Sequence, residues 1–172
     1  MLDFLKVDDV LNNLDLKGNM IAAEFGCGSA DFTMALAKKL TKGRVYAIDV
    51  QEEKLSALKN KLKLERHINT YMILGDLETP RGSTLEDNSL DVVLIPNVLF
   101  QAQDQYAIIQ EGQRILKSGG MLLVIDWLKG GAFSPKELLS PDEVKKMATK
   151  LGLSLNKEFA TGDYHYALLF TK

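Results

Sequence analysis

The chain is poor in the residues and segments that mark several protein classes. Cys27 is the one cysteine among 172 residues, which excludes an internal disulfide and is typical of a reducing compartment. No apolar run approaches the ~20 residues of a membrane-spanning helix, and Met1 to Phe4 lack the basic start of a secretory signal. A net charge of −2 gives no general attraction to nucleic acid. We therefore expect a cytoplasmic protein with no membrane insertion and no nucleic-acid partner.

The remaining composition is that of one ordinary globular domain. Hydrophobic residues make up 46% of the chain and charged residues 26%. A chain of 172 residues is long enough to bury a full core, and no repeat, linker or low-complexity tract divides it. The sequence predicts a single domain over residues 1–172.

One stretch, residues 22–30, organises the chain. A hydrophobic run from Met20 to Phe25 stops at Gly26 and Gly28, and a helical pattern of apolar residues follows. This order predicts a strand, a tight glycine turn and a helix whose N-terminus points back at the turn. Residues without a Cβ let a ligand lie against backbone, and a helix N-terminus offers unpaired N–H groups. A Gly-x-Gly turn alone is weak evidence for a ligand.

Strands and helices alternate through the rest of the chain. We expect helices near residues 4–15, 31–41, 52–65 and 104–117, and a helix that begins at Ser140-Pro141 with Glu143 completing a capping box. We expect strands near residues 20–25, 44–49, 69–74, 90–95, 121–126, 153–160 and 164–171, with a turn at 118–120. The last two strands form a tight hairpin, so they are antiparallel. The pattern predicts an α/β fold with a mostly parallel sheet covered by helices on both faces.

Polar side chains stand at or just after the ends of five successive predicted strands. They are Glu24, Asp49, Asp76, Asn97 and Asp126. In such sheets ligands bind outside the carboxyl ends of the strands, so five polar residues in succession favour a binding site over chance turn residues. A structural explanation remains for some: Asp76 and Asn97 are also typical turn residues.

On these motifs the sequence resembles the class I S-adenosylmethionine-dependent methyltransferases. Residues 24–30 (EFGCGSA) are similar to the family's first motif, with Ala30 in place of its third glycine. Residues 45–49, 75–77, 87–93 and 114–120 are similar to four further segments. The resemblance implies a Rossmann-like doubly wound sheet of six parallel strands and an antiparallel seventh, in the order 3-2-1-4-5-7-6. Within the family the likeness is to the small-molecule branch that includes ubiquinone and menaquinone biosynthesis enzymes.

The resemblance also implies which residues bind the cofactor. Gly26 and Gly28 would let backbone lie against S-adenosylmethionine, and Glu24 would orient its amino group. Asp49 would accept hydrogen bonds from both ribose hydroxyls, because two carboxylate oxygens fit a vicinal diol. The whole predicted set is Glu24, Gly26, Cys27, Gly28, Asp49, Val50, Asp76, Leu77 and Asn97, with Asp76 and Leu77 at the adenine. No metal site is predicted, and the N-terminal helix within residues 1–18 would serve as a partial lid.

The reaction and the acceptor are less well defined. Methyl transfer is a direct displacement that yields S-adenosylhomocysteine, and it needs a general base only if the acceptor must lose a proton. Two candidates for that base are His165 and Asp126, although a histidine at a strand start is more often a packing residue. Phe100, Trp127 and Phe133 hint at an apolar or aromatic small-molecule acceptor. The acceptor atom and the presence of a homodimer are left open.

Two other functions fit parts of the pattern. A nicotinamide-dependent oxidoreductase shares the strand, glycine turn and acid, but its third glycine would stand where this chain has Asp31, whose charge repels a pyrophosphate. A non-catalytic module that binds S-adenosylmethionine or S-adenosylhomocysteine and acts through a partner is not excluded. The methyltransferase is the prediction.

Overall fold

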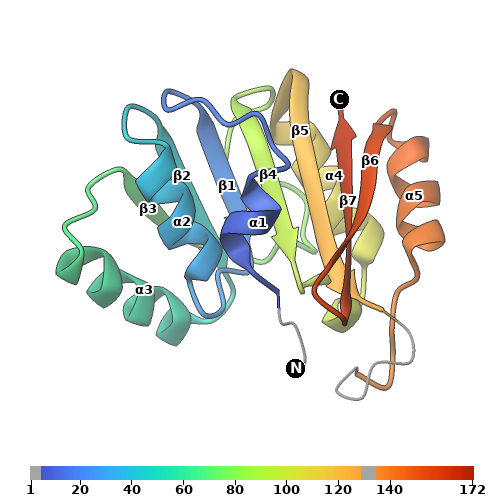
Figure 1. Cartoon of the computed structure of the whole chain (residues 1–172), viewed down its shortest axis with the longest axis horizontal. Coiled ribbons are helices and arrows are strands. Elements are labelled where there is room, and N and C mark those ends of the chain that lie inside the picture. The colour runs from blue at the N-terminus through green and yellow to red at the C-terminus, as the bar shows by residue number, and fades with distance from the viewer. Residues whose placement is uncertain (1–4, 129–134) are drawn as a thin grey trace.

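A seven-stranded sheet runs through the computed structural model of the chain, which describes residues 5–128 and 135–172 (Figure 1). The strands are β1 (Ile21–Phe25), β2 (Arg44–Asp49), β3 (Thr70–Leu74), β4 (Leu90–Pro96), β5 (Leu116–Trp127), β6 (Ser154–Thr161) and β7 (His165–Thr171). Their order is β3-β2-β1-β4-β5-β7-β6, and β7 is antiparallel to both of its neighbours. The other pairs are parallel. The predicted fold class and strand order are confirmed.

Helices cover both faces of the sheet because successive residues of each strand point to opposite sides. The helices are α1 (Val7–Leu11), α2 (Asp31–Lys39), α3 (Glu52–Leu64), α4 (Gln105–Ile115) and α5 (Pro141–Lys150), with a short 3₁₀ helix, η1 (Leu99–Gln101). On one face Ala22 and Val92 pack with Leu11 of α1 and Leu36 of α2. On the other face Phe25 and Val93 pack with residues of α4 and α5. Two apolar layers therefore enclose the sheet.

The helix starts follow the local sequence. At α5 the Ser140 side chain accepts a hydrogen bond from Glu143 N and the Glu143 carboxylate accepts one from Ser140 N, which is the predicted capping box. Pro141 occupies the first turn, where its missing N–H costs no helical hydrogen bond. Asp104 begins α4 in a related way, because its carboxylate accepts from Ala107 N at 2.9 Å.

Two predicted segments are wrong. Residue 4 of the helix expected over residues 4–15 lies outside the described residues. The observed helix, α1, ends at Leu11, and the Asn13 side-chain amide donates to the carbonyl of Asp9, which would otherwise lack a partner at the helix end. The turn expected at 118–120 lies inside β5 as a bulge, since the register against β4 shifts between Leu90 and Val92. Backbone bonds between Lys172 and the residues 119–120 hold this bulge in the sheet.

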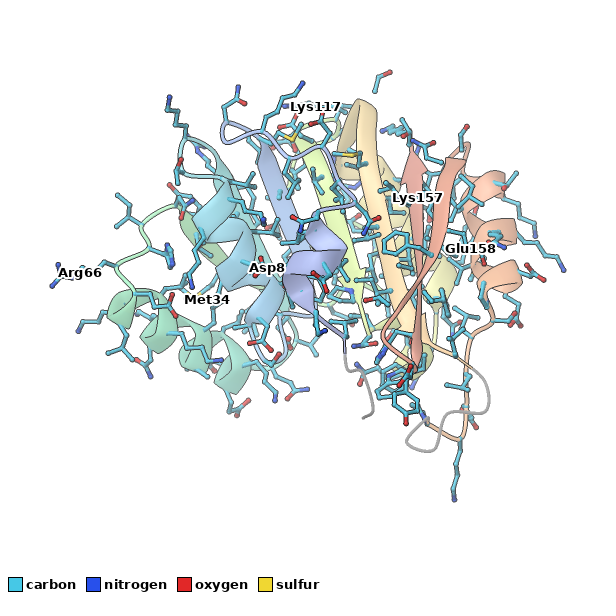
Figure 2. All side chains as sticks on the ribbon, in the orientation of Figure 1. Asp8, Met34, Arg66, Lys117, Lys157 and Glu158 are labelled. Carbon is cyan, nitrogen blue, oxygen red and sulfur yellow. The ribbon has the colours of Figure 1, made fainter. Side chains whose placement is uncertain are left out.

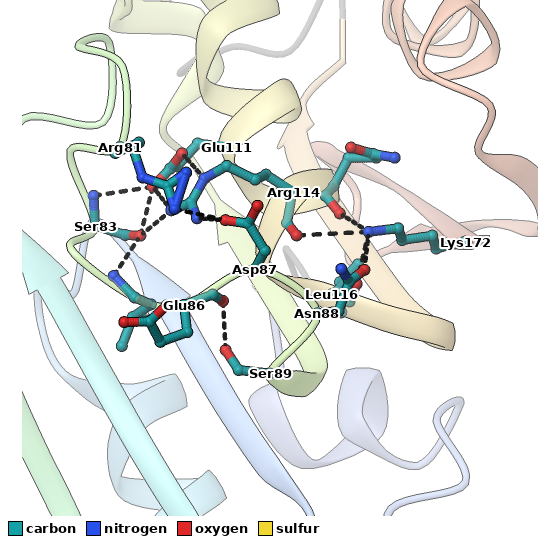
Figure 3. Close-up of polar contacts among 12 residues, drawn as sticks. Arg81, Ser83, Glu86, Asp87, Asn88, Ser89, Glu111, Arg114, Leu116 and Lys172 are labelled. Carbon is teal, nitrogen blue, oxygen red and sulfur yellow. Dashed lines mark hydrogen bonds and ion pairs between the residues drawn. The ribbon is translucent and has the colours of Figure 1, made fainter.

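The connection from β3 to β4 contains no helix, and a polar network holds it (Figure 3). The Arg114 guanidinium donates to both carboxylate oxygens of Glu111, at 2.7 and 2.8 Å, and to Asp87. Ser83 donates to Glu111 from its backbone and its hydroxyl. Two segments that resemble family motifs, 87–93 and 114–120, therefore meet here. They lie where β4 and β5 begin, at the edge of the sheet opposite the strands' carboxyl ends.

Within residues 5–128 and 135–172, no helix has both the length and the apolar character needed to cross a bilayer.

Candidate functional site

A cleft with a volume of about 610 Å³ opens at the carboxyl ends of β1, β2, β3 and β4. This is within the ~300–1,000 Å³ range typical of small-molecule sites. All nine residues predicted to bind the cofactor line it: Glu24, Gly26, Cys27, Gly28, Asp49, Val50, Asp76, Leu77 and Asn97. The parallel strands explain this grouping, because their carboxyl ends meet at one edge of the sheet.

The glycine turn after β1 lies tightly against the segment after β4. Gly26 has a φ of +73°, and a Cβ there would lie 2.5 Å from the Val98 Cγ2 atom. Gly28 has a φ of +41°. Ala30, which stands at the family's third glycine, also has a left-handed φ of +72°. The backbone therefore keeps the conformation that a glycine would favour, at a cost of about 1–2 kcal/mol for the alanine.

Asp49 is the last residue of β2, and its carboxylate links the segments that follow β1 and β2. Its Oδ1 atom accepts a hydrogen bond from Gln51 N at 2.9 Å, and its Oδ2 atom accepts one from Gly28 N at 3.4 Å. The residue is only 7% exposed, yet it lines the cleft. Each carboxylate oxygen has two lone pairs, so Oδ1 can accept a further bond from a ligand. Oδ2 also lies 3.7 Å from the Cys27 thiol, a weak donor that a ligand hydroxyl can replace.

Glu24 lies deeper, in β1 and facing α2. It is 2% exposed, and its Oε2 atom accepts a hydrogen bond from the Thr33 hydroxyl. Burial raises the pKa of this carboxyl to about 8, although the Thr33 hydroxyl and N–H act against the shift. The negative charges of Asp31 and Asp49 raise this pKa further. The carboxyl therefore stays protonated near neutral pH unless a cation approaches.

The β3 side of the cleft is more exposed. Asp76 Oδ1 accepts from Glu78 N at 2.9 Å, so Asp76 both closes a turn and lines the cleft. Leu77 is buried beside it, and Val50 is 59% exposed. Together they give this end an apolar surface next to a hydrogen-bond acceptor.

Asn97 follows β4 with a φ of +56°, in the left-handed region that asparagine tolerates better than most residues. Its Oδ1 atom is buried, and no described residue donates a hydrogen bond to it. Val98 and Gln101 continue the wall, and the Gln101 amide donates to Asn97 O at 3.1 Å. An unsatisfied buried acceptor in a cleft wall is suited to a ligand donor.

Cys27 is a packing residue in this turn. It is 1% exposed, with its sulfur 3.7 Å from Asp49 Oδ2. Burial and the charge of Asp49 raise the pKa of the thiol to about 12, so no thiolate is present at neutral pH.

The two candidate bases lie outside the residues that line the cleft. Each Asp126 oxygen accepts a backbone N–H, from Phe100 at 3.0 Å and from Trp127 at 2.8 Å, and burial raises the pKa of Asp126 to about 6. The His165 ring packs against Trp127 at a tilt of 40°, with ring centroids 4.3 Å apart, and burial lowers the pKa of His165. Both residues stay predictions. Phe100 packs edge-on against Trp127 at 6.4 Å, and Phe133 lies outside the described residues.

A second cavity, of about 540 Å³, lies between α1, α2 and α3, near the labelled Asp8 and Met34 in Figure 2. Ion pairs from Lys38 to Glu65 (2.8 Å) and from Lys39 to Asp8 (3.9 Å) balance its charge. Figure 2 also shows Arg66 pointing away from the molecule at the end of α3. These features are those of a solvated helix surface.

Some cleft residues were missed from the sequence. Leu5, Val7, Gln51, Lys54, Val98 and Gln101 all line the cleft. Gln51 and Val98 directly follow predicted site residues, and Gln101 lies four positions after Asn97, so their nearness in the chain was a usable signal. Leu5 and Val7 lie in the segment 1–18 that was predicted to be a partial lid, but which of its side chains reach the cleft depends on tertiary packing.

The charges of the cleft decide between the two cofactors considered. Five acidic side chains line it, those of Glu24, Asp31, Asp49, Asp76 and Glu78, and of these Glu24 is protonated near neutral pH in the free protein. The one cationic side chain that lines it in the described residues is that of Lys54. This environment fits a cationic ligand and disfavours the pyrophosphate of a dinucleotide. The tight glycine turn and the free Asn97 acceptor fit S-adenosylmethionine as well. In the described part of the chain, no group of three or more His, Cys, Asp or Glu residues is arranged to hold a metal ion.

Comparison with known proteins identifies the family of the chain. A family model described as a methyltransferase domain matches residues 16–168. The chain belongs to the class I S-adenosylmethionine-dependent methyltransferases. The predicted family and the predicted cofactor, S-adenosylmethionine, are confirmed by this membership.

Several known members of this methyltransferase family are similar to the chain. The demethylmenaquinone methyltransferase of Geobacillus stearothermophilus is 29% identical over 132 residues, which are 76% of this chain and 55% of that protein. The corresponding enzyme of Staphylococcus haemolyticus is 33% identical over 119 residues, 68% of this chain and 47% of that protein. The chain thus spans about half the length of these curated relatives. An Aquifex aeolicus S-adenosylmethionine-dependent methyltransferase has the same fold, with a TM-score of 0.85, 24% identity, and coverage of 96% of this chain and 89% of that one.

Proposed function

We propose that this methyltransferase transfers a methyl group from S-adenosylmethionine to a small aromatic acceptor of the quinol type. The observation that carries the proposal is the acidic cleft, in which all nine predicted residues meet. The quinol class is supported by the relatives named demethylmenaquinone methyltransferase. The chain spans about half of those proteins, so its activity and its acceptor are proposals.

Each proposed cofactor contact uses an available atom. The Glu24 carboxyl would pair with the ligand's ammonium group, and the Asp49 oxygens would accept from the ribose hydroxyls. Asp76 would accept from the adenine amine, with Leu77 and Val50 against the ring. The Gly26 and Gly28 backbone would lie along the methionine part, and a side chain at Gly26 would collide with Val98.

The protein's main task is then to position the reactants. The bound sulfonium supplies an already activated methyl group, so bringing the acceptor in line is the largest effect the protein can add. Asn97, Val98 and Gln101 stand beside the proposed methionine site and would face the acceptor. No general base is required unless the acceptor must lose a proton, and His165 and Asp126 remain the candidates.

We further propose that residues 1–172 act as one domain and that the segment 1–18 is a partial lid. Leu5 and Val7 in the cleft wall support the lid. A cytoplasmic location, no nucleic-acid partner and a small-molecule acceptor belong to the same proposal. The open question of a homodimer is answered by light scattering on the purified protein.

The test is calorimetric titration with S-adenosylmethionine and S-adenosylhomocysteine, and with NAD as a control ligand. We expect micromolar binding of the first two and none of NAD. Asp49→Ala removes both ribose acceptors and should abolish binding. Asp15→Ala removes a carboxylate that is 88% exposed and lies outside the cleft, so it should bind like wild type.

Activity is measured next, as S-adenosylhomocysteine formed in the presence of reduced naphthoquinones. Turnover with these quinols and none with simple amines or thiols would support the acceptor class. Binding without turnover on any acceptor would instead favour a non-catalytic module. Failure of the wild type to bind either ligand would rule out the proposed function for this chain.

A further inference from the structure

Among the described residues, Glu24 forms no ion pair with a cation. It lies in the cleft wall, is 2% exposed, and its side chain points toward α2. The charged groups that face it are Asp31, in the first turn of α2, and Asp49, at the end of β2, and both are acidic. From β4 its neighbour in register is Leu94, and the cleft also receives the apolar Leu5, which precedes α1, and Val7, the first residue of α1. Within the described residues, the groups that shift the pKa of Glu24 include no cation, and the one cationic side chain that lines the cleft is that of Lys54 in α3.

Thr33 is the side chain that contacts this carboxyl. It is fully buried, in the first turn of α2, and its hydroxyl donates to Glu24 Oε2. A threonine hydroxyl in a helix commonly bonds back to a carbonyl of the preceding turn. Here it bonds across to β1 instead, and the β-branched side chain has few rotamers in a helix. The bond therefore fixes one carboxyl oxygen of Glu24.

We propose that Thr33 is a positioning residue for Glu24: its hydroxyl holds one carboxyl oxygen, turns the other toward the ammonium end of S-adenosylmethionine, and makes binding release the proton of this carboxyl. The inference rests on the proposed function, since it needs the cofactor in this cleft. It adds a role for a residue outside the predicted set and a dependence of binding on pH.

The proton release follows from the surroundings of the carboxyl. In the free protein burial raises the pKa of Glu24 to about 8, so the carboxyl is protonated at pH 6 to 7. An ammonium group brought alongside favours the carboxylate, so the proton leaves as the ligand binds. The ligand's own α-amino group keeps its proton in this range, because α-amino groups titrate near ~7.7–8.0. Affinity should therefore rise by up to about tenfold from pH 6 to pH 7.

Thr33 sets the pH at which the Glu24 carboxyl loses its proton. Its hydroxyl and N–H lower the pKa of Glu24 against the effect of burial. Thr33→Val keeps the shape of the side chain and removes the hydroxyl bond, so the carboxyl should hold its proton to higher pH. The ligand should then bind more weakly at pH 7, and the rise in affinity should move to higher pH. Thr33→Ser restores the hydroxyl and should restore both properties.

The experiment is calorimetric titration with S-adenosylhomocysteine, which carries the same ammonium group, at pH 6, 6.5, 7 and 7.5. Two buffers of different ionisation enthalpy give the number of protons released. We expect the wild type and Thr33→Ser to release close to one proton near pH 6 to 7. We expect Glu24→Gln to release none and to show no rise in affinity. Thr149→Val, an exposed helical threonine on α5, is the matched control and should behave like wild type.

The outcomes separate the two proposals. A wild type that binds no ligand contradicts the proposed function itself. Binding by wild type without proton release, or a Thr33→Val protein with the affinity and proton count of wild type, overturns the inference alone. A purely structural role for Thr33 would lower stability without moving the pH profile.

A ligand-free measurement covers the case in which Thr33→Val does not fold. Because the folded Glu24 carboxyl keeps its proton up to about pH 8 and an unfolded glutamate loses it near 4.5, the folded state binds more protons between these values. The unfolding equilibrium constant of wild type should then rise by up to about tenfold per pH unit across this range. Glu24→Gln should lack this rise, and an equal rise in that variant would overturn the inference.

Discussion

Gly26→Ala tests whether the turn after β1 is as tightly packed as the structure indicates. Two costs add at this position. An alanine at φ +73° pays the left-handed penalty of about 1–2 kcal/mol, and its Cβ would lie 2.5 Å from Val98 Cγ2. Overpacking of this kind costs a further ~1–3 kcal/mol. We expect Gly26→Ala to destabilise the protein by about 2–5 kcal/mol.

Gly152→Ala separates the two costs. Gly152 has a φ of +80°, and a Cβ there would meet no atom within 4 Å, so the variant carries the backbone penalty without the collision. We expect a loss of about 1–2 kcal/mol, or a fall in Tm of about 2–8 °C. The difference between the two variants is the energy of the collision with Val98.

Val98→Ala should relieve that collision. With its methyl groups removed, the nearest atom of residue 98 to an added Cβ is its own Cβ, at 3.9 Å, an ordinary contact. A double-mutant cycle between Gly26→Ala and Val98→Ala, followed by urea unfolding, should therefore show a favourable coupling of about 1–3 kcal/mol. S-adenosylhomocysteine binding should weaken in Gly26→Ala and stay unchanged in Gly152→Ala.

Equal losses of stability in Gly26→Ala and Gly152→Ala, together with no coupling to Val98, would refute this reasoning. They would mean that the segment after β4 moves freely and that the cleft wall is not held by this contact.

Two further predictions concern stability. Ala30→Gly should stabilise the protein by about 0.5–1 kcal/mol, measured as a higher urea midpoint. Glycine relieves the strain of the left-handed φ of +72°, and this gain exceeds the entropy that the glycine adds to the unfolded chain. A lower urea midpoint would contradict the prediction. Arg114→Ala leaves Glu111, which is 4% exposed, without its cationic partner and should cost about 3–5 kcal/mol, while adding Glu111→Gln should recover part of the loss. Cofactor affinity of the folded Arg114 variant should match wild type, because this network lies at the opposite edge of the sheet.

Patterns within short segments were readable from the sequence because their causes are local. The capping box at Ser140 and Glu143 depends on two residues three positions apart, and the structure contains it. The period of apolar residues gave the order of strands and helices. Errors arose where a distant segment decides the local conformation, as at 118–120, where the chain is held in β5 by Lys172.

The fold and the set of residues at its carboxyl edge follow from the amino-acid pattern alone, because the direction of parallel strands brings Glu24, Asp49, Asp76 and Asn97 to one edge. The surroundings of those residues depend instead on how the chain packs. Burial, which depends on contacts between segments far apart in the chain, leaves the Glu24 carboxyl protonated against Thr33 and removes Asp126 and His165 from the cleft wall. Identity and spacing of residues do not carry that information, because desolvation and hydrogen bonding arise from the packed surroundings.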